Sequence, residues 1–342
     1  FKQKTAYEIG VRLVGSEMCI RDRANSISRE TKIKNLCMAG GVALNCVANG
    51  KILKEKIFEN IWIQPAAGDA GGALGAALGM WHKELNKTRT ANPMDSMQGA
   101  YLGPAYDQRA IEKKLVECEA RFDVASEEAV LEQAAQALTE GKAVGWFQGR
   151  MEFGPRALGN RSILGDPRSE TMQKMLNLKV KYRESFRPFA PSVLRENIAE
   201  WFELDHDSPY MLLVDGVKHT KRLQVPDDDR ELAGFDKLTI KRSEIPAVTH
   251  VNCSARIHTV HKETNPKYHA LICKFKEKTG CPVLVNTSFN VRGEPIVCTS
   301  EDAFRCFMGT NIEMLVVGNC ILRKENQDPT LTKSYKDKYK FD

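Results

Sequence analysis

Two short apolar segments, each followed by glycines and then by a stretch with helical spacing, constrain the fold of the first part of this chain. The residues LCMA at 36–39 precede a glycine pair and a helical stretch through Leu53. The residues NIWIQP at 60–65 precede a second helical stretch, rich in alanine and glycine, that ends near Trp81. This strand–turn–helix alternation predicts an α/β arrangement.

The later part of the chain has well-marked helix ends and strands. Ser126 is the expected N-cap of a helix that stops at Gly141, and a strand follows at AVGWF. Ser300 is the expected N-cap of a second helix that ends at Gly309. The apolar runs Pro282–Val285 and 314–317 are predicted strands.

These patterns divide the chain into five segments. The residues LVGSEMCIRDR at 13–23 have no clear period and resemble translated sequencing-adapter sequence. We therefore expect residues 1–23 not to belong to the natural protein. The other expected segments are a first domain over 24–83, a linker over 84–99, a second domain over 100–325 and a frayed tail over 326–342.

Composition narrows the class of protein. The chain has 342 residues, 42% of them hydrophobic and 27% charged, which fits a globular protein of about two domains. No apolar run reaches the roughly eighteen residues that span a bilayer, and no export leader precedes the predicted fold, so we expect a cytoplasmic protein without membrane contact. The ten cysteines have no CxxC spacing and are expected to be reduced and mostly buried. The net charge of +6 is spread along the chain, so nucleic acid is not an expected partner.

Residues 145–194 concentrate cations around glycines. Guanidinium groups bind phosphate oxygens in pairs, and glycines let backbone N–H groups approach the same anion, so this segment predicts a site for a polyanionic small molecule. The alternative is a solvated basic face. The cations are Arg150, Arg156, Arg161, Arg168, Lys181, Arg183 and Arg187.

Glycines at two strand-to-helix junctions mark a second candidate site. Gly40 and Gly41 follow the first strand, and Gly71 and Gly72 follow Asp69 at the second junction. Backbone amides at such turns can receive a nucleotide, although tight packing of helix on strand also explains the glycines. Asp69 is either a hard ligand for a metal ion or the cap of the following helix.

Four motifs together carry a resemblance to a known family. The chain resembles the O-carbamoyltransferases of nodulation-factor and antibiotic biosynthesis from about Leu36 to Leu322. The motifs are MAGGVALNCVANGKIL, GWFQGRMEFGPRALGNRSILGDPR, VKYRESFRPFAPSVL and GCPVLVNTSFNVRGEPIV. The resemblance implies an α/β plus α+β chain, in which the second half of an actin-like (ASKHA) nucleotide-binding domain is followed by a YrdC-like domain of the threonylcarbamoyl-adenylate-synthase type.

The resemblance also implies site residues. Those expected to carry the chemistry are Arg156, Lys181, Arg187, Arg256, Asn286 and Ser288. Those expected to bind ATP and other anions are Gly40, Gly41, Asn45, Gly71, Gly72, Arg150, Arg161, Arg183 and Asn290. Asn286 and Ser288 are expected directly after a strand, where the alternative is a role as turn residues. Asp69 is the implied metal ligand.

The implied reaction uses carbamoyl phosphate and ATP with Mg²⁺ to form carbamoyl adenylate, then passes the carbamoyl group to a hydroxyl of a small-molecule acceptor. Iron or another divalent metal is implied for the complete actin-like domain. This chain has no histidine before His82, whereas the family's other metal ligands are histidines on an earlier helix. We therefore expect the first half of that domain to be missing, and only adenylate formation to persist. A homodimer is left open.

Two other functions and one other metal site are consistent with parts of the sequence. An actin-like ATP-binding regulatory protein would explain the glycine turns but not the arginines, and a tRNA threonylcarbamoyl-modifying enzyme would share both folds. His258 and His261 are spaced as metal ligands could be, but no third ligand is evident. Asn252 and Cys253 stand where the family has aspartate and glycine, which alters the surroundings of Arg256.

Overall fold

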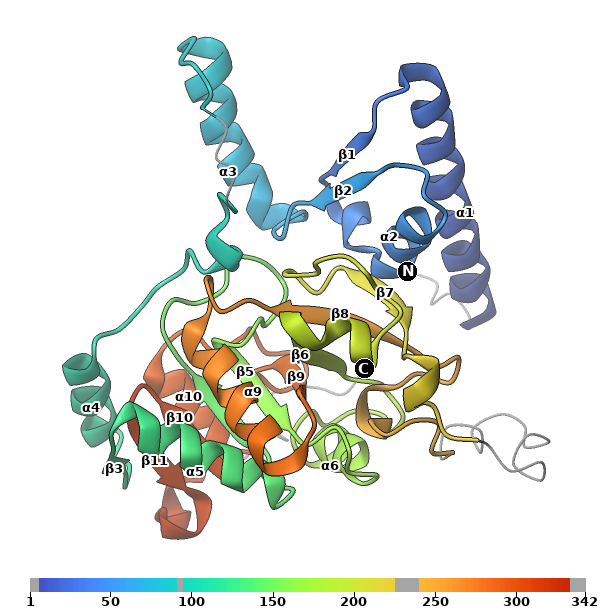
Figure 1. Ribbon diagram of the computed structural model, residues 1–342. Helices are drawn as coiled ribbons and strands as arrows, with labels where there is room; N and C mark the ends of the chain where they lie inside the picture. Colours follow the sequence, from blue (N-terminus) through green and yellow to red (C-terminus); the bar gives the residue numbers. More distant parts are fainter. Residues whose placement is uncertain (1–5, 91–94, 225–239, 333–342) are drawn as a thin grey trace. The chain divides into compact units, whose positions relative to one another are not determined.

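The computed structural model describes residues 6–90, 95–224 and 240–332. The chain divides into two compact units, one of residues 1–96 with 212–214 and the other of residues 97–211 with 215–342. Figure 1 shows both units. Among the described residues, no helix combines the length and the apolar character needed to cross a membrane.

The first unit contains a small parallel sheet with helices. Strands β1 and β2 pair in parallel from Asn35 opposite Asn60 to Met38 opposite Ile63. The strand–helix alternation predicted for this part of the chain is confirmed. Its elements are α1 (Ala6–Thr31), β1 (Asn35–Met38), η1 (Gly41–Leu44), α2 (Cys46–Lys54), β2 (Asn60–Ile63), α3 (Asp69–Gly79) and η2 (Met80–Glu84).

Helix α1 includes residues 13–23, for which the sequence showed no clear period. Arg21 forms an ion pair with Glu55 at 2.5 Å, and Lys51 forms one with Glu17 at 2.5 Å. Ala24 on the next turn packs in a small apolar cluster with α2. The segment is therefore a regular helix with contacts to α2, and its absence from the natural protein stays a prediction.

The second unit is built on a nine-stranded mixed sheet in the order β3-β11-β10-β4-β5-β9-β6-β8-β7 (Figure 1). Its strands are β3 (Asp123–Val124), β4 (Val144–Phe147), β5 (Arg161–Gly165), β6 (Ala190–Leu194), β7 (Leu213–Gly216), β8 (Ser254–Val260), β9 (Val283–Ser288), β10 (Met314–Val317) and β11 (Cys320–Arg323). Its helices are α4 (Gln108–Glu117), α5 (Glu127–Thr139), α6 (Met172–Lys179), α7 (Ile198–Trp201), α9 (Pro266–Thr279) and α10 (Ser300–Met308). Short helical turns include η4 (Arg195–Asn197).

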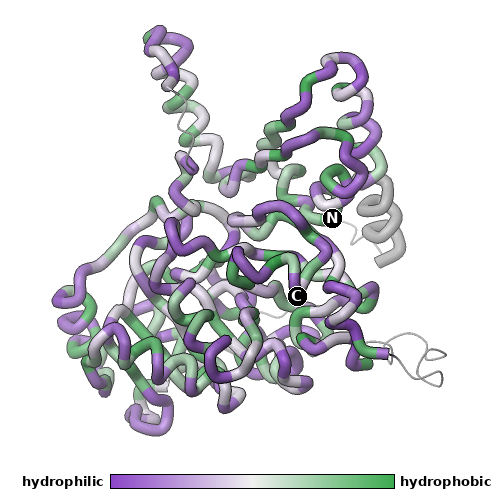
Figure 2. The backbone as a smooth tube through the Cα atoms, in the orientation of Figure 1, coloured by the Kyte–Doolittle hydropathy of each residue, from purple (hydrophilic) through white to green (hydrophobic). Residues whose placement is uncertain are grey.

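Helices α5 and α9 pack against each other and against the sheet, and α10 packs on β4 and β10. Trp146, Phe275, Phe289 and Phe307 are among the large side chains that are fully buried there. Hydrophobic and hydrophilic stretches alternate along this unit, as expected for elements with one buried face (Figure 2). The core therefore holds the central strands in a fixed register.

Local sequence explains most helix ends. The Ser126 side chain accepts a hydrogen bond from the Ala129 N–H, so the predicted cap of α5 is confirmed. The prediction for α10 was wrong by one residue, because Thr299 is the N-cap and forms a capping box with Asp302. Ser300 is instead the first residue of that helix.

Strand β9 is longer than predicted. Asn286 and Ser288 lie within it, rather than in a turn after Val285. The strand is paired on both sides, and these residues face Leu164 and Ser162 of β5 across the ladder. Backbone pairing with two neighbours overrides the turn preference of asparagine and serine.

The C-terminal residues and the cysteines also differ from expectation. Gln327 is buried and its amide donates to the carbonyls of Arg121 and Arg323, so the residues up to 332 are not frayed. The rest of the expected tail, 333–342, lies outside the described residues, as do 91–94 of the expected linker and 1–5 of the expected non-natural segment. All ten cysteines are free, but only Cys281, Cys306 and Cys320 are buried.

Candidate functional site

The register of the large sheet brings four sequence-distant motifs to one end. Phe147 at the end of β4 faces Arg161 at the start of β5, and Ser162 faces Ser288 at the end of β9. Asn286 also faces Ala190 at the start of β6. The loops that leave β4 and β9 and those that enter β5 and β6 therefore meet at the same end of adjacent strands. This is the candidate site of the second unit.

Lys181 lies at the centre of this end. It is only 4% exposed, and its ammonium donates to both the carbonyl and the hydroxyl of Ser288. It also donates to the carbonyl of Asn290 at 2.9 Å and to its side-chain oxygen at 2.7 Å. Lys181 thus holds the last residue of β9, and Asn290 just after it, against the loop that precedes β6.

Arg183 lies between this lysine and two further arginines. Burial, together with the positive charges of Arg187 and Arg292, lowers the pKa of Arg183 to about 10. Burial and the charge of Arg183 in turn lower the pKa of Lys181 to about 7. Arg183 is therefore close enough to each of the other three cations to be repelled by it, and Glu184 is ion-paired with Arg187 at 2.9 Å. Such a concentration of positive charge in a partly buried, weakly solvated site favours binding of an anion.

Asn286 is the buried polar group beside the cluster. Its amide nitrogen donates to the carbonyl of Ala157 at 3.1 Å and to the hydroxyl of Ser192 at 2.9 Å. Because a backbone carbonyl can only accept, this contact fixes which end of the amide carries the nitrogen. The side-chain oxygen is buried and makes no hydrogen bond. Behind it, Ser192 also contacts His258 at 2.8 Å.

Arg161 does not point its charge at a ligand. It is fully buried, and its guanidinium donates five hydrogen bonds to the carbonyls of Pro104, Gln148, Gly149 and Asn160. It also stacks on Phe147, at 3.6 Å from the ring centroid. These contacts favour a structural role for Arg161 over the predicted binding role.

The other predicted arginines lie around the same end of the sheet. Arg150 is exposed and donates to the Gly103 carbonyl at 3.2 Å, while Arg156 is half-buried on the loop between β4 and β5. Arg256 is half-buried on β8, two residues before His258, which pairs with Ser192 of β6. The two residues Asn252 and Cys253 precede it, and Cys253 has a positive φ of 57°.

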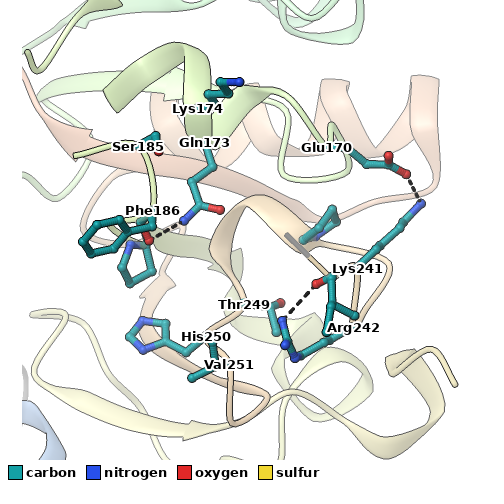
Figure 3. A pocket seen from close by; sticks show the side chains of 13 residues that line it. Glu170, Gln173, Lys174, Ser185, Phe186, Lys241, Arg242, Thr249, His250 and Val251 are labelled. Atoms are coloured by element: carbon teal, nitrogen blue, oxygen red, sulfur yellow. Dashed lines mark hydrogen bonds and ion pairs between the residues drawn. The ribbon is translucent and has the colours of Figure 1, made fainter. Parts of the chain in front are cut away.

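A pocket of about 670 Å³ lies next to the cluster (Figure 3). Its walls come from α6, from the loop that carries Arg183 and Arg187, and from residues 240–251. Burial and the nearby charge of Arg256 lower the pKa of the lining residue His250. None of the predicted site residues lines the pocket, and no motif in the sequence marked it. The lining includes Gln173, Lys174, Ser185, Phe186, Arg242 and His250.

The predicted site residues of the first unit have mainly local roles. The Asn45 side chain caps α2 by accepting from the Ala48 N–H at 3.1 Å. Gly40 has φ of 92°, and a Cβ on Gly71 would lie 2.1 Å from the Ala66 carbonyl, so both positions require glycine for backbone reasons. Gly41 begins η1, while Gly72 lies within α3, and added side chains there would meet open space.

Asp69 is exposed in the first turn of α3, whose N-cap is Gly68, so the expected alternative of a capping role is wrong. Among the described residues, no group of three potential metal ligands includes Asp69. The residues present do not fit a catalytic metal centre there. His258 and His261 do not form one either, since they contact Ser192 and Thr259 respectively.

The depressed pKa of Lys181 has a consequence for stability. An exposed lysine titrates near 10.5, whereas burial lowers the pKa of Lys181 to about 7 in the folded protein. Between these values the unfolded chain binds a proton that the folded chain has released, so stability rises with pH across this window. We expect the free energy of unfolding to increase from pH 7 to pH 10 relative to Lys181→Met, as measured by denaturant titration. Equal pH dependence in both proteins would contradict the lowered pKa.

The family model described as "Carbamoyltransferase C-terminus" matches residues 135–324, which contain the whole cluster around Lys181. The chain belongs to the carbamoyltransferase family. This confirms the resemblance found in the sequence, and it makes the chain a member of an enzyme family. A second model, "Carbamoyltransferase N-terminus", matches residues 10–78 and so includes the segment 13–23 that was expected to lie outside the family.

Several curated proteins are similar over most of the chain. An uncharacterized protein of Synechocystis is 56% identical over 92% of this chain and 51% of its own length. The nodulation protein NolNO of Sinorhizobium fredii is 43% identical, over 88% of this chain and 42% of that protein. The 3'-hydroxymethylcephem-O-carbamoyltransferase of Streptomyces clavuligerus is 33% identical over 84% of this chain and 49% of its own length. The chain thus spans about half the length of the curated relatives it matches.

Among solved structures, full-length HypF in its phosphate- and nucleotide-bound form matches 61% of this chain and 22% of its own. The sequence identity is 16% and the TM-score is 0.36, a likeness too low to carry an argument. The mixed α/β character of the chain rests on its own strands and helices.

Proposed function

We propose that residues 97–342 form the donor half of a carbamoyltransferase, which binds carbamoyl phosphate and ATP and makes carbamoyl adenylate. The observation that carries this proposal is the meeting of Lys181, Arg183, Arg187 and Arg292 beside the buried amide of Asn286. Both substrates are strongly anionic and repel each other. Catalysis therefore mainly requires cations that are held in position before the substrates bind and that give up little bound water when they do.

The residues of the site suit the two steps that convert carbamoyl phosphate and ATP into carbamoyl adenylate. Water releases phosphate from carbamoyl phosphate and leaves carbamate, and a carbamate oxygen then displaces pyrophosphate from the α-phosphorus of ATP. The arginines would hold the phosphate oxygens during both steps, and Lys181 would keep Ser288 and Asn290 in position beside them. Asn286 would accept a hydrogen bond from the carbamoyl amino group through its unpartnered oxygen. The adjoining pocket is of a size that fits a nucleoside.

We further propose that this unit is a YrdC-like domain that follows part of an actin-like domain, and that the carbamoyl group passes to a hydroxyl of a small acceptor. Support for the acceptor class is the similarity to a cephem O-carbamoyltransferase and to nodulation proteins. Magnesium would accompany ATP. We derive no step through a metal at Asp69, because its surroundings do not fit one.

Exchange of labelled pyrophosphate into ATP tests the proposal, since exchange requires reversible formation of the adenylate. We expect exchange that depends on carbamoyl phosphate. Arg187→Ala should raise the KM for carbamoyl phosphate about tenfold, because a partly exposed charge–phosphate contact contributes on the order of 1.5 kcal/mol. The exposed Arg109→Ala on α4 is the matched control and should behave as the wild type.

Other outcomes would replace the proposal. Exchange that ignores carbamoyl phosphate would favour an ATP-binding regulatory protein. Exchange that requires threonine and bicarbonate would favour a threonylcarbamoyl-adenylate enzyme of the tRNA-modifying type. A folded sample that binds neither inorganic phosphate nor ATP in calorimetry would contradict the anion site itself.

A further inference from the structure

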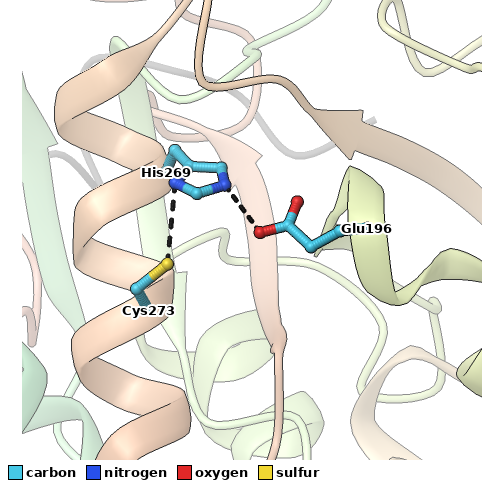
Figure 4. Close-up of side chains that lie close together, drawn as sticks. All are labelled: Glu196, His269 and Cys273. Carbon is cyan, nitrogen blue, oxygen red and sulfur yellow. Dashed lines mark hydrogen bonds and ion pairs between the residues drawn. The ribbon is translucent and has the colours of Figure 1, made fainter.

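Three side chains outside the candidate site lie together on the second unit. His269 and Cys273 are one turn apart on α9, and Glu196 comes from the short turn η4 after β6 (Figure 4). The His269 Nε2 atom is 2.9 Å from Glu196 Oε1, and its Nδ1 atom is 3.6 Å from Cys273 Sγ. Neither the fold nor the proposed reaction uses this group.

The distances match those around a tetrahedral metal ion. With a metal–nitrogen distance of 2.0–2.1 Å and a metal–sulfur distance of about 2.3 Å, the nitrogen and sulfur ligands are separated by about 3.6 Å. A histidine that ligates through one ring nitrogen commonly donates its other N–H to a carboxylate. The Glu196 contact supplies this second interaction, and it leaves Nδ1 with its lone pair directed to the side of Cys273.

The helix that carries two of the groups is fixed before any ion binds. Asn265 caps α9 through its side chain, and Gly280 ends the helix in the left-handed conformation. The His269 side chain is only 12% exposed, so its ring has little freedom. The ligands are therefore held in place at little further entropic cost.

The chemistry of the ligands points to one class of ion. A divalent ion would displace the thiol proton of Cys273 to solvent, and the thiolate and imidazole would then share one positive centre. Thiolate and imidazole select zinc-like ions over magnesium and calcium.

We propose that Cys273 Sγ and His269 Nδ1 bind a divalent zinc-like ion, that Glu196 orients the imidazole, and that water completes the coordination. The ion would link two successive turns of α9, remote in sequence from Asp69 and independent of the proposed carbamoyl chemistry. The full chain should therefore bind one Zn²⁺ or Co²⁺ through this group.

Titration with Co²⁺ provides the test, because a cobalt–thiolate bond gives a charge-transfer band in the near ultraviolet. The titration uses the full chain with the exposed Cys19 and Cys37 changed to serine, which removes two competing thiols. We expect one equivalent of Co²⁺ to produce the band and Zn²⁺ to displace it. Cys273→Ser should abolish the band, whereas Cys118→Ser, at another half-buried thiol, should leave it unchanged.

Glu196→Gln separates orientation of the histidine from a contribution to folding. It should keep the band and weaken Co²⁺ binding about 10- to 100-fold, the usual cost of losing a carboxylate that orients a ligand. The proposal is overturned if Cys273→Ser retains the band, if Glu196→Gln binds Co²⁺ as tightly as its parent, or if the parent gives no band with Co²⁺ in excess.

Discussion

Lys181→Met should lower the rate of carbamoyl-phosphate-dependent pyrophosphate exchange by at least about 100-fold. Lys181 is buried and holds Ser288 and Asn290 at the anion site, and disruption of a preorganised anion site typically costs 10²- to 10³-fold in rate. The methionine keeps the length of the side chain, so the space stays filled. Initial exchange rates at saturating ATP measure the effect.

Lys179→Met is the matched control for this variant. Lys179 is an exposed lysine at the end of α6, two residues earlier in the same segment, and its loss should leave exchange unchanged. Because Lys181 also holds Ser288 and Asn290, near-ultraviolet circular dichroism is needed to show that the variant folds. A folded Lys181→Met protein with normal exchange would exclude Lys181 from the donor site.

Arg161→Met should reduce the free energy of unfolding by about 3–5 kcal/mol. The substitution leaves the buried carbonyl oxygens of Gln148 and Asn160 and the partly buried ones of Pro104 and Gly149 without the guanidinium that satisfies them, and each unsatisfied buried group costs about 1–3 kcal/mol before relaxation. Denaturant titration monitored by tryptophan fluorescence measures the loss, and Trp146 on the adjoining strand β4 is a buried reporter.

Arg150→Met provides the comparison, since Arg150 is exposed on the loop that precedes β5 and should change stability by no more than about 0.5 kcal/mol. The pair distinguishes the two roles considered for Arg161. If Arg161→Met were as stable as the wild type but bound ATP poorly, the ligand-binding role predicted from the sequence would be correct and the structural role would be wrong.

The elements of the fold could be predicted where the signal is local. The strand at Met314–Val317 and the cap at Ser126 depend on a short apolar run and a side-chain oxygen, and both were found correctly. The extent of β9 could not be predicted, because it depends on pairing with β5 and β6, which are distant in sequence. Thr299 and Ser300 are adjacent and chemically alike, so only the backbone shows which one precedes the helix.

The candidate site was predictable as a set of residue types but not as an arrangement. The motifs around Lys181 and Asn286 indicated anion binding, and the structure brings them to one end of the sheet. Composition cannot tell an arginine that faces a ligand from one that satisfies buried carbonyls, which is why Arg161 was placed with the binding residues. Likewise, His269 and Cys273 show a helical spacing, but Glu196 lies 73 residues from His269 in the sequence, and nothing local links it to them.

The fixed orientation of the Asn286 amide bears on which acyl phosphates the proposed donor site would accept. Its two amide hydrogens are already used by Ala157 and Ser192, so only an acceptor is left for the substrate. A carbamoyl group offers N–H donors to this oxygen, whereas acetyl phosphate would place a methyl group against it. A hydrogen bond gained in one case and absent in the other is worth about 1–3 kcal/mol, or roughly a ten- to hundredfold preference. Discrimination against acetyl phosphate would thus follow from the backbone carbonyl of Ala157, which fixes the orientation of the amide.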